Sequence, residues 1–130
     1  QHAAALDPLT ARRAAHPVGE TERVRAGAVA LEAGDLEAFG QLMFQSHHSS
    51  IANFENSCPE LDFVVDLCRR MPGVLGARLS GGGFGGSVVA LVHPRDSEIV
   101  SRALQRPYKR HFGHACTTQV VMPSDGASVL

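Results

Sequence analysis

The order of apolar and polar positions predicts helices in the first half of the chain. Residues 18–33 are mostly Ala, Glu and Arg, which favour helix, and Gly34 follows where a C-terminal cap belongs. Asp35 is then a suitable N-cap for a second helix, which we expect to end near residues 47–50. The apolar residues of that second helix recur at helical spacing: Leu36, Phe39 and Met43.

A third helix has a more distinct start. The segment Ser57-Cys58-Pro59-Glu60 has the form of a capping box, in which the Ser and Glu side chains bind backbone amides and Pro stands in the first turn. The pair Pro72-Gly73 ends this helix. Its buried stripe is formed by Leu61, Val64, Val65 and Cys68.

In the second half of the chain the pattern changes to strands. Residues 74–79 and 87–93 predict two strands that are joined by a glycine-rich turn. Asp96 is an N-cap for a further helix, and residues 115–122 predict a final strand before a tail over residues 124–130. The inner face of that further helix is formed by Ile99, Val100, Ala103 and Leu104.

A short strand is also expected over residues 11–16. Pro17 disfavours helical geometry at the residue before it, but it is accepted in the first turn of a helix that follows. With the helices of the first half counted as one layer, the order of elements is β-α-β-β-α-β. The sequence therefore predicts an α+β fold, a ferredoxin-like split β-α-β-β-α-β with extra helices packed on one face of an antiparallel sheet.

Composition is that of one globular domain over residues 1–130. Hydrophobic residues make up 44% of the chain and charged residues 19%. The formal net charge of -1 leaves no basic excess for phosphate backbones or anionic lipid, so we expect neither nucleic-acid nor membrane binding. The longest apolar runs are also too short to cross a bilayer.

The cysteines favour a reducing location. Cys58, Cys68 and Cys116 are an odd number and contain no C-x-x-C pair. Cys58 and Cys68 fall on one predicted helix, about 15 Å apart along its axis, which is too far for a disulfide. Because no charged-then-apolar leader precedes them, we expect a cytoplasmic protein. The chain begins at Gln1 without an initiator Met, and we expect it to be part of a longer protein.

Glycines are concentrated in one short segment. Five of the 13 glycines lie between Gly81 and Gly86, around Phe84. Glycine lets another molecule approach the main chain, and successive exposed N–H groups form an anion-binding concavity. The segment is not a Walker loop, because no Lys-Ser/Thr follows and the next predicted element is a strand. The residues alone predict a backbone-lined ligand edge, with a tight hairpin turn or close backbone packing as the alternative.

At this point a family resemblance enters. The segment Arg78-Leu79-Ser80-Gly81-Gly82-Gly83-Phe84-Gly85-Gly86 resembles the third conserved motif of the GHMP small-molecule kinases, in the form that galactokinases have. Residues 12–20, 34–47 and 57–62 are similar to other segments of the same family, so the resemblance covers most of the chain. Two positions depart from it: Pro17 replaces a residue that is usually Val, and Ser87 stands where Cys is common.

The resemblance implies a role in phosphoryl transfer. The intact enzyme would transfer the γ-phosphoryl group of ATP, with Mg²⁺, to the C1 hydroxyl of galactose or a related sugar. This chain would be its GHMP kinase C-terminal domain, with the glycine-rich loop beside the nucleotide phosphates and the sugar. The cofactor-binding residues that the resemblance assigns are Ser80, Gly81, Gly82, Gly83, Phe84, Gly85 and Gly86.

No catalytic or metal-binding residue of the family can be matched to this sequence. In the family the phosphate-binding loop, the catalytic Asp and Arg and the sugar-binding residues belong to an N-terminal kinase domain, which we expect to be absent here. We therefore expect the 130 residues alone to be inactive. We also expect an exposed apolar interdomain face beside the loop, with Phe84 in it, and self-association through that face.

Two other classes of function remain open from the sequence. One is a regulator that binds sugar and ATP without turnover, and the other is a stand-alone ferredoxin-like binding module. Within the enzyme class, kinases for N-acetylgalactosamine or other sugars are a further alternative. The residues that distinguish these functions belong to the N-terminal domain.

The histidines invite a metal hypothesis that the sequence does not favour. His111 and His114 lie near Cys116, and His47 is followed by His48. Neither group comes with the further ligands at the spacing that zinc sites have. We interpret these histidines as solvated surface residues.

Three other groups have structural interpretations. Asp62 and Asp66 are spaced to lie on one side of a helix, which we interpret as its polar outer face. The basic residues within 106–111 are interpreted as a solvated helix end, because the total charge is near neutral. Cys68 and Cys116 are expected to be buried small apolar residues.

Overall fold

The structure, a computed structural model, describes residues 6–124 and 126. Over these residues the fold is α+β, with four α-helices and a two-stranded antiparallel sheet. Short helical turns, η2 and η3, follow α2 and precede α4. The elements in chain order are α1 (Pro8–Glu32), α2 (Leu36–Ser49), η2 (Ser50–Phe54), α3 (Pro59–Arg70), β1 (Val74–Ser80), β2 (Ser87–Val92), η3 (Pro94–Asp96) and α4 (Ser97–Phe112).

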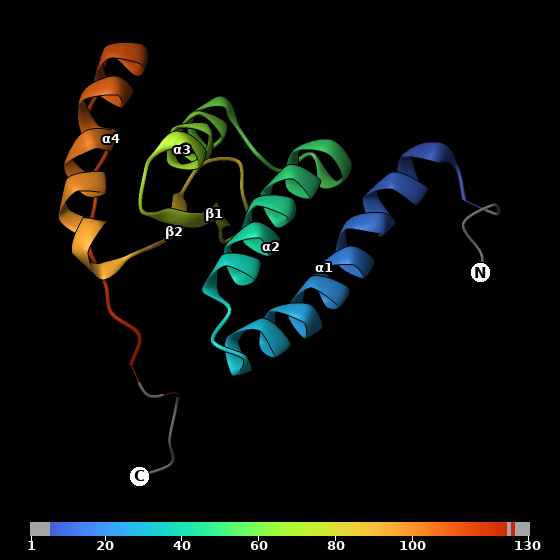
Figure 1. Ribbon diagram of the computed structural model, residues 1–130. Helices are drawn as coiled ribbons and strands as arrows, with labels where there is room; N and C mark the ends of the chain where they lie inside the picture. Colours follow the sequence, from blue (N-terminus) through green and yellow to red (C-terminus); the bar gives the residue numbers. More distant parts are fainter. Residues whose placement is uncertain (1–5, 125, 127–130) are drawn as a thin grey trace, which may run out of the picture.

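The helices surround the small sheet on several sides (Figure 1). Helices α1 and α2 form an antiparallel pair, of which α2 contacts β1 directly and α1 lies on the outer side. Helix α3 packs on the sheet between α2 and α4, and the chain after α4 turns back along that helix. No helix in the described part of the chain is both long and apolar enough to span a membrane.

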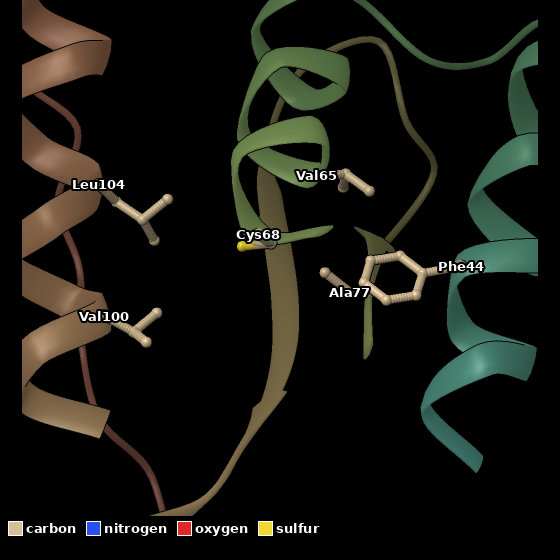
Figure 2. Packing of buried hydrophobic residues seen from close by; sticks show 6 residues of the cluster. All are labelled: Phe44, Val65, Cys68, Ala77, Val100 and Leu104. Atoms are coloured by element: carbon tan, nitrogen blue, oxygen red, sulfur yellow. The ribbon is translucent and has the colours of Figure 1, made fainter. Parts of the chain in front are cut away.

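The buried core lies where α2, α3, α4 and β1 meet (Figure 2). Side chains from all four elements point toward one another there, and partly buried residues of β2 pack against them. The sheet side of the core is Ala77, which is fully buried. The core residues are Phe44, Val65, Cys68, Ala77, Val100 and Leu104.

Several predicted element ends are confirmed. Gly34 follows the first helix with a φ of 70°, and the Asp35 side chain accepts a hydrogen bond from the Ala38 amide (2.9 Å). Both central strands are present, and Ser80 pairs with Ser87 next to the turn. The capping box is wrong, because Cys58 is the N-cap of α3 and makes no side-chain bond there. The Ser57 hydroxyl instead donates to the Asp62 carboxylate.

The predicted strand over residues 11–16 is wrong, because these residues belong to α1. Asp7 caps this helix by accepting from the amides of Leu9 and Thr10 (3.1 Å each), and Pro8 stands at its first position. The helix continues through Pro17, which costs about 3 kcal/mol in a helix interior. Contacts of α1 with α2 and with η2 hold the helix against the rest of the domain.

The predicted strand over residues 115–122 is also wrong, because the structure shows no strand there. Instead the Thr118 hydroxyl accepts hydrogen bonds from Ser101 (2.8 Å) and Gln105 (2.9 Å), so this segment lies along α4. The sheet has the two strands β1 and β2, and neither predicted outer strand is present among the described residues. The ferredoxin-like split arrangement is therefore not present among the described elements, and their order is α-α-α-β-β-α.

Helix α2 and strand β1 are in backbone contact. A Cβ atom added to Gly40 would lie 2.1 Å from the Leu75 carbonyl oxygen, and one added to Gly76 would lie 2.4 Å from the Gly40 carbonyl oxygen. Neither position has room for a side chain, so two glycines face each other across the interface. Residue 75 is also the site of a bulge in the pairing of β1 with β2, which turns its carbonyl toward the helix.

We predict that Gly40→Ala lowers the free energy of unfolding by about 1–3 kcal/mol, because the added methyl group collides with backbone that cannot move aside. Gly19→Ala is the matched control, since its nearest neighbour is the flexible end of the Arg23 side chain at 3.0 Å. Ala favours helix over Gly by about 1 kcal/mol, so the control should be neutral or stabilised. Equal unfolding midpoints in urea for the two variants would show that the close approach is not real.

Candidate ligand-binding loop

The glycine-rich loop, residues 80–86, connects β1 to β2 and is mostly exposed. Most residues of this loop have positive φ angles. Phe84, which is not a glycine, also has a positive φ of 57°. The glycines with positive φ are Gly81 (85°), Gly83 (87°), Gly85 (123°) and Gly86 (90°).

Asn56 holds this loop through two hydrogen bonds, which we call the Asn56 clamp. The backbone oxygen of Asn56 accepts a hydrogen bond from the Phe84 amide (2.7 Å), and its side-chain amide donates to the Gly82 oxygen (3.1 Å). Only 6% of Asn56 is exposed. The loop is therefore fixed on the domain by bonds to one buried residue that lies between η2 and α3.

The clamp separates the roles of two neighbouring glycines. A Cβ atom on Gly83 would lie 1.9 Å from the Asn56 oxygen, and its φ is one that other residues rarely adopt. A Cβ atom on Gly82 would have no atom within 4 Å, and its φ is not positive. Backbone packing therefore explains Gly83, whereas nothing in the packing of this chain requires a glycine at Gly82.

Phe84 also lacks a structural explanation within the chain. Its positive φ is unfavourable for a bulky residue, by about 1–3 kcal/mol, and 79% of it is exposed. An apolar ring that is held in a strained conformation and pointed at solvent buries nothing in this domain. Such strain is typical of positions that contact a ligand or another domain.

The loop can bind a group that carries oxygen atoms. Gly81, Gly82 and Gly85 leave open space where a Cβ would stand, so an oxygen can approach their backbone. Turns that alternate the sign of φ point successive N–H groups at one spot and so favour an anion. The Phe84 amide is not free for this role, because it is bonded to Asn56.

Arg78 brings a positive charge to the start of the loop, and it is partly neutralised. Its guanidinium lies 3.6 Å from Glu20, which also accepts from Arg23 (2.6 Å) and from the Ser46 hydroxyl (2.8 Å). Burial acts to raise the pKa of Glu20, but the bonds from Arg23 and Ser46 outweigh it and hold that pKa below its usual value. The Glu20 carboxylate thus joins α1, α2 and β1.

His47 supports the loop from the side of α2. It is 3% exposed, and its Nδ1 accepts a hydrogen bond from the Leu79 amide (3.2 Å). Its Nε2 lies 3.2 Å from the Asp62 carboxylate, at ion-pair distance but without hydrogen-bond geometry. The interpretation of His47 as a surface residue is therefore wrong, because its ring is buried beside β1 and faces the partly exposed Asp62.

The electrostatics of this contact favour neutral His47. Burial lowers the pKa of His47, and the nearby Asp62 only partly opposes this. A protonated ring would also carry a hydrogen on Nδ1 and could no longer accept from the Leu79 amide. The end of β1, directly before the loop, is thus tied to the neutral imidazole.

The remaining candidate groups do not meet at the loop. His111 stacks on Phe63 with a centroid separation of 4.5 Å, and over the described residues no group of three or more His, Cys, Asp or Glu could hold a metal ion. Cys68 is buried as expected, which raises the pKa of its thiol to about 11, whereas Cys116 is only half-buried. A hollow of about 730 Å³ lies between α1, α2 and α3, and no loop residue lines it.

Sequence reasoning found the loop but missed what holds it. Asn56 lies between two helical segments, where asparagine is common for many reasons. His47 lies on the buried side of α2, where its position in the apolar pattern was a usable signal that the adjacent His48 obscured. Glu55, which has a positive φ of 60°, had no signal in the sequence.

Comparisons with known proteins place the chain in a class. Residues 28–110 match the family described as "GHMP kinases C terminal". The chain therefore belongs to the GHMP kinase C-terminal domain family, and its resemblance to the C-terminal domain of galactokinases is confirmed. The galactokinase of Homo sapiens is 44% identical over 119 residues, which are 92% of this chain and 29% of that protein.

Solved structures agree with this placement. The structure titled "Lactococcus lactis Galactokinase Complexed with Galactose" superposes with a TM-score of 0.80 at 35% identity, over 84% of this chain and 28% of that one. The L. major mevalonate kinase in complex with R-mevalonate superposes with a TM-score of 0.58 at 36% identity, over 65% of this chain and 26% of that one. The chain thus spans less than a third of the length of these relatives.

We predict that Gly83→Ala lowers the free energy of unfolding by about 1–3 kcal/mol, because the methyl group would meet the Asn56 oxygen at a positive φ. Gly82→Ala, one residue earlier, should change it by less than about 0.5 kcal/mol. Urea unfolding of the two variants measures the difference. If Gly82→Ala costs as much as Gly83→Ala, the loop does not pack on Asn56 as described.

We also predict that the chain loses stability as the pH falls through the range where histidines titrate. A histidine whose pKa is lower in the folded state than in the unfolded state destabilises the fold below its unfolded value of about 6.5, by about 1.4 kcal/mol per unit of difference. His47→Asn, which keeps an acceptor near the Leu79 amide, should reduce this pH dependence. Burial lowers the pKa of His16 as well, so the comparison with wild type isolates His47.

The measurement is the urea midpoint of each protein between pH 8 and pH 5. The predicted result is a smaller loss in His47→Asn than in wild type below pH 6.5. Parallel curves for the two proteins would show that His47 does not titrate with folding.

Proposed function

We propose that this chain is the C-terminal domain of a galactokinase-like sugar kinase and that its glycine-rich loop forms one wall of the ligand site. The observation that carries the proposal is the loop itself: a clamped backbone, an exposed and strained Phe84, and an open Gly82 that packing does not explain. The similarity to galactokinases, one of them solved with galactose, supports the choice of substrate.

In this proposal the loop acts through its backbone and not through a reactive side chain. The residues concerned are Ser80, Gly81, Gly82, Gly83, Phe84, Gly85 and Gly86. The free amides of the loop would bind oxygens of the ATP phosphates or of the sugar, and would keep the γ-phosphoryl group near the C1 hydroxyl that receives it. Positioning and charge stabilisation supply most of the catalysis in this class of reaction.

The fit to the two implied cofactors differs. Open space over Gly81, Gly82 and Gly85 fits the close approach of a phosphate or sugar oxygen. Among the described residues no group of three or more His, Cys, Asp or Glu could hold a metal ion, and we propose no magnesium ligand in this chain. We assign no catalytic residue to it either.

Residues 1–130 form a single domain in this proposal, and the partner is an N-terminal kinase domain. Apolar residues of α1 and the loop are exposed in the chain described here: Val18, Val24, Val29 and Phe84. Burial of such residues stabilises an interface by roughly 25 cal/mol per Å². We infer that the N-terminal domain covers the loop side, and that without it the chain associates with itself through Phe84.

The three free cysteines suit a cytoplasmic location.

We predict that the 130-residue chain alone does not phosphorylate galactose in the presence of ATP and Mg²⁺. A chimaera in which this chain replaces the matching C-terminal part of the human galactokinase should show measurable activity, and we call it the reconstituted kinase. In it, Gly82→Val should lower kcat on the order of 10²-fold, because a side chain there displaces the ligand.

The control is the thermal unfolding midpoint of the Gly82→Val variant, which should match that of the parent because no atom of the chain opposes the added side chain. Turnover by the chain alone would contradict the proposed division of roles. Full activity of Gly82→Val would place the loop away from the ligand.

A further inference from the structure

Asn56 is connected to the rest of the domain on the side away from the loop. The backbone amide of Asn56 donates to the backbone oxygen of Ser50 (3.2 Å), which anchors Asn56 to η2. The residue before it, Glu55, has a left-handed φ of 60°. This bend turns the backbone at the end of η2, just before Asn56. The position of Asn56 therefore depends on how Glu55 is held.

Glu55 is held by two successive residues of α1. Arg12 donates to one carboxylate oxygen of Glu55 at 2.6 Å, and Arg13 donates to the other at 3.1 Å. One turn further along α1, the His16 ring stacks on the Phe54 ring at a centroid separation of 4.9 Å. A single exposed ion pair contributes little, but two guanidinium groups on one carboxylate form a network with a defined geometry.

The charge state of Glu55 agrees with this arrangement. The hydrogen bond from Arg13 holds the pKa of Glu55 below its usual value, with Arg12 acting in the same direction. The carboxylate is therefore charged at neutral pH and able to bind both arginines. Because all three side chains are partly exposed, salt screens the network.

We propose that Asn56 is the positioning residue of the glycine-rich loop, and that the Arg12–Glu55–Arg13 network fixes Asn56 so that the loop is shaped before a ligand arrives. The network on α1 is connected to the loop through η2 and Asn56. The inference rests on the proposed function for the meaning of the loop, but the clamp itself is testable without any ligand.

The test uses the Phe84 amide, whose hydrogen bond to the Asn56 backbone oxygen opens whenever the loop detaches. Asn56→Asp keeps that oxygen but removes the side-chain donor to Gly82, and Asn56→Leu does the same without adding a charge. Both variants should raise the hydrogen-exchange rate of the Phe84 amide by roughly fivefold or more, the loss of one hydrogen bond.

Asn53→Asp is the matched control. Asn53 lies on η2, three residues before Asn56, and its side-chain amide donates to the Ser49 hydroxyl (3.0 Å), not to the loop. The control should leave Phe84 exchange unchanged. If Asn56→Leu and Asn53→Asp give equal Phe84 exchange, the proposal is overturned.

The arginine network is tested by Glu55→Gln, which keeps the shape of the side chain and removes its charge. This variant should also raise Phe84 exchange, and added salt should then change it less than in wild type. The exposed Glu22→Gln on α1 is the control and should behave as wild type. Wild-type exchange at Phe84 in Glu55→Gln, at low and high salt alike, would contradict a role for the network.

Kinetics separate this inference from the proposed function. In the reconstituted kinase, Asn56→Leu should lower kcat about tenfold at a temperature where the variant is fully folded, whereas Asn53→Asp should leave kcat unchanged. If Asn56→Leu speeds Phe84 exchange but neither Asn56→Leu nor Gly82→Val changes kcat, the clamp is supported. The placement of the loop at the ligand is then contradicted. Unchanged exchange contradicts the clamp whatever the kinetics show.

Discussion

The backbone contact between Gly40 on α2 and Gly76 on β1 is the constraint on which the rest of the domain depends. From that point the helix and the strand run side by side, and their rises match. Seven residues of helix advance about 10 Å, as do three residues of strand. The second contact of the pair therefore falls at His47 and Leu79, where the imidazole accepts the strand amide. A side chain at either glycine would separate the elements and break this alignment.

Loop geometry follows from that alignment. Because α2 is fixed along β1, its end brings η2 and then Asn56 beneath the turn that follows β1. The clamp holds Phe84 in a left-handed backbone conformation that a bulky residue does not favour. Strain at Phe84 and at Glu55 is thus compensated by packing elsewhere in the domain, an arrangement that suits a loop shaped in advance for a ligand.

Local signals in the sequence were sufficient for the two central strands, the helix ends at Gly34 and Asp35, and the position of the loop. They failed where long-range contacts outweigh local preference. Pro17 marks a helix start by local rules, yet α1 begins at Pro8 and continues through Pro17, packed against α2 and η2. Residues 115–122 have a strand composition, yet this segment lies along α4 and bonds to it through Thr118. Asn56 and His47 act through partners more than 25 positions away, which a single sequence does not show.

The central claim is that this domain shapes its glycine-rich loop without help from a ligand. The most direct measurement is the intraresidue amide-to-Hα nuclear Overhauser effect of Phe84 in the isolated, ligand-free chain, because a positive φ brings these two hydrogens close together. The account predicts a strong effect at Phe84 and a weak one at Val88, four residues later in β2. A weak effect at Phe84 would show that the left-handed conformation is absent in solution and would contradict the claim.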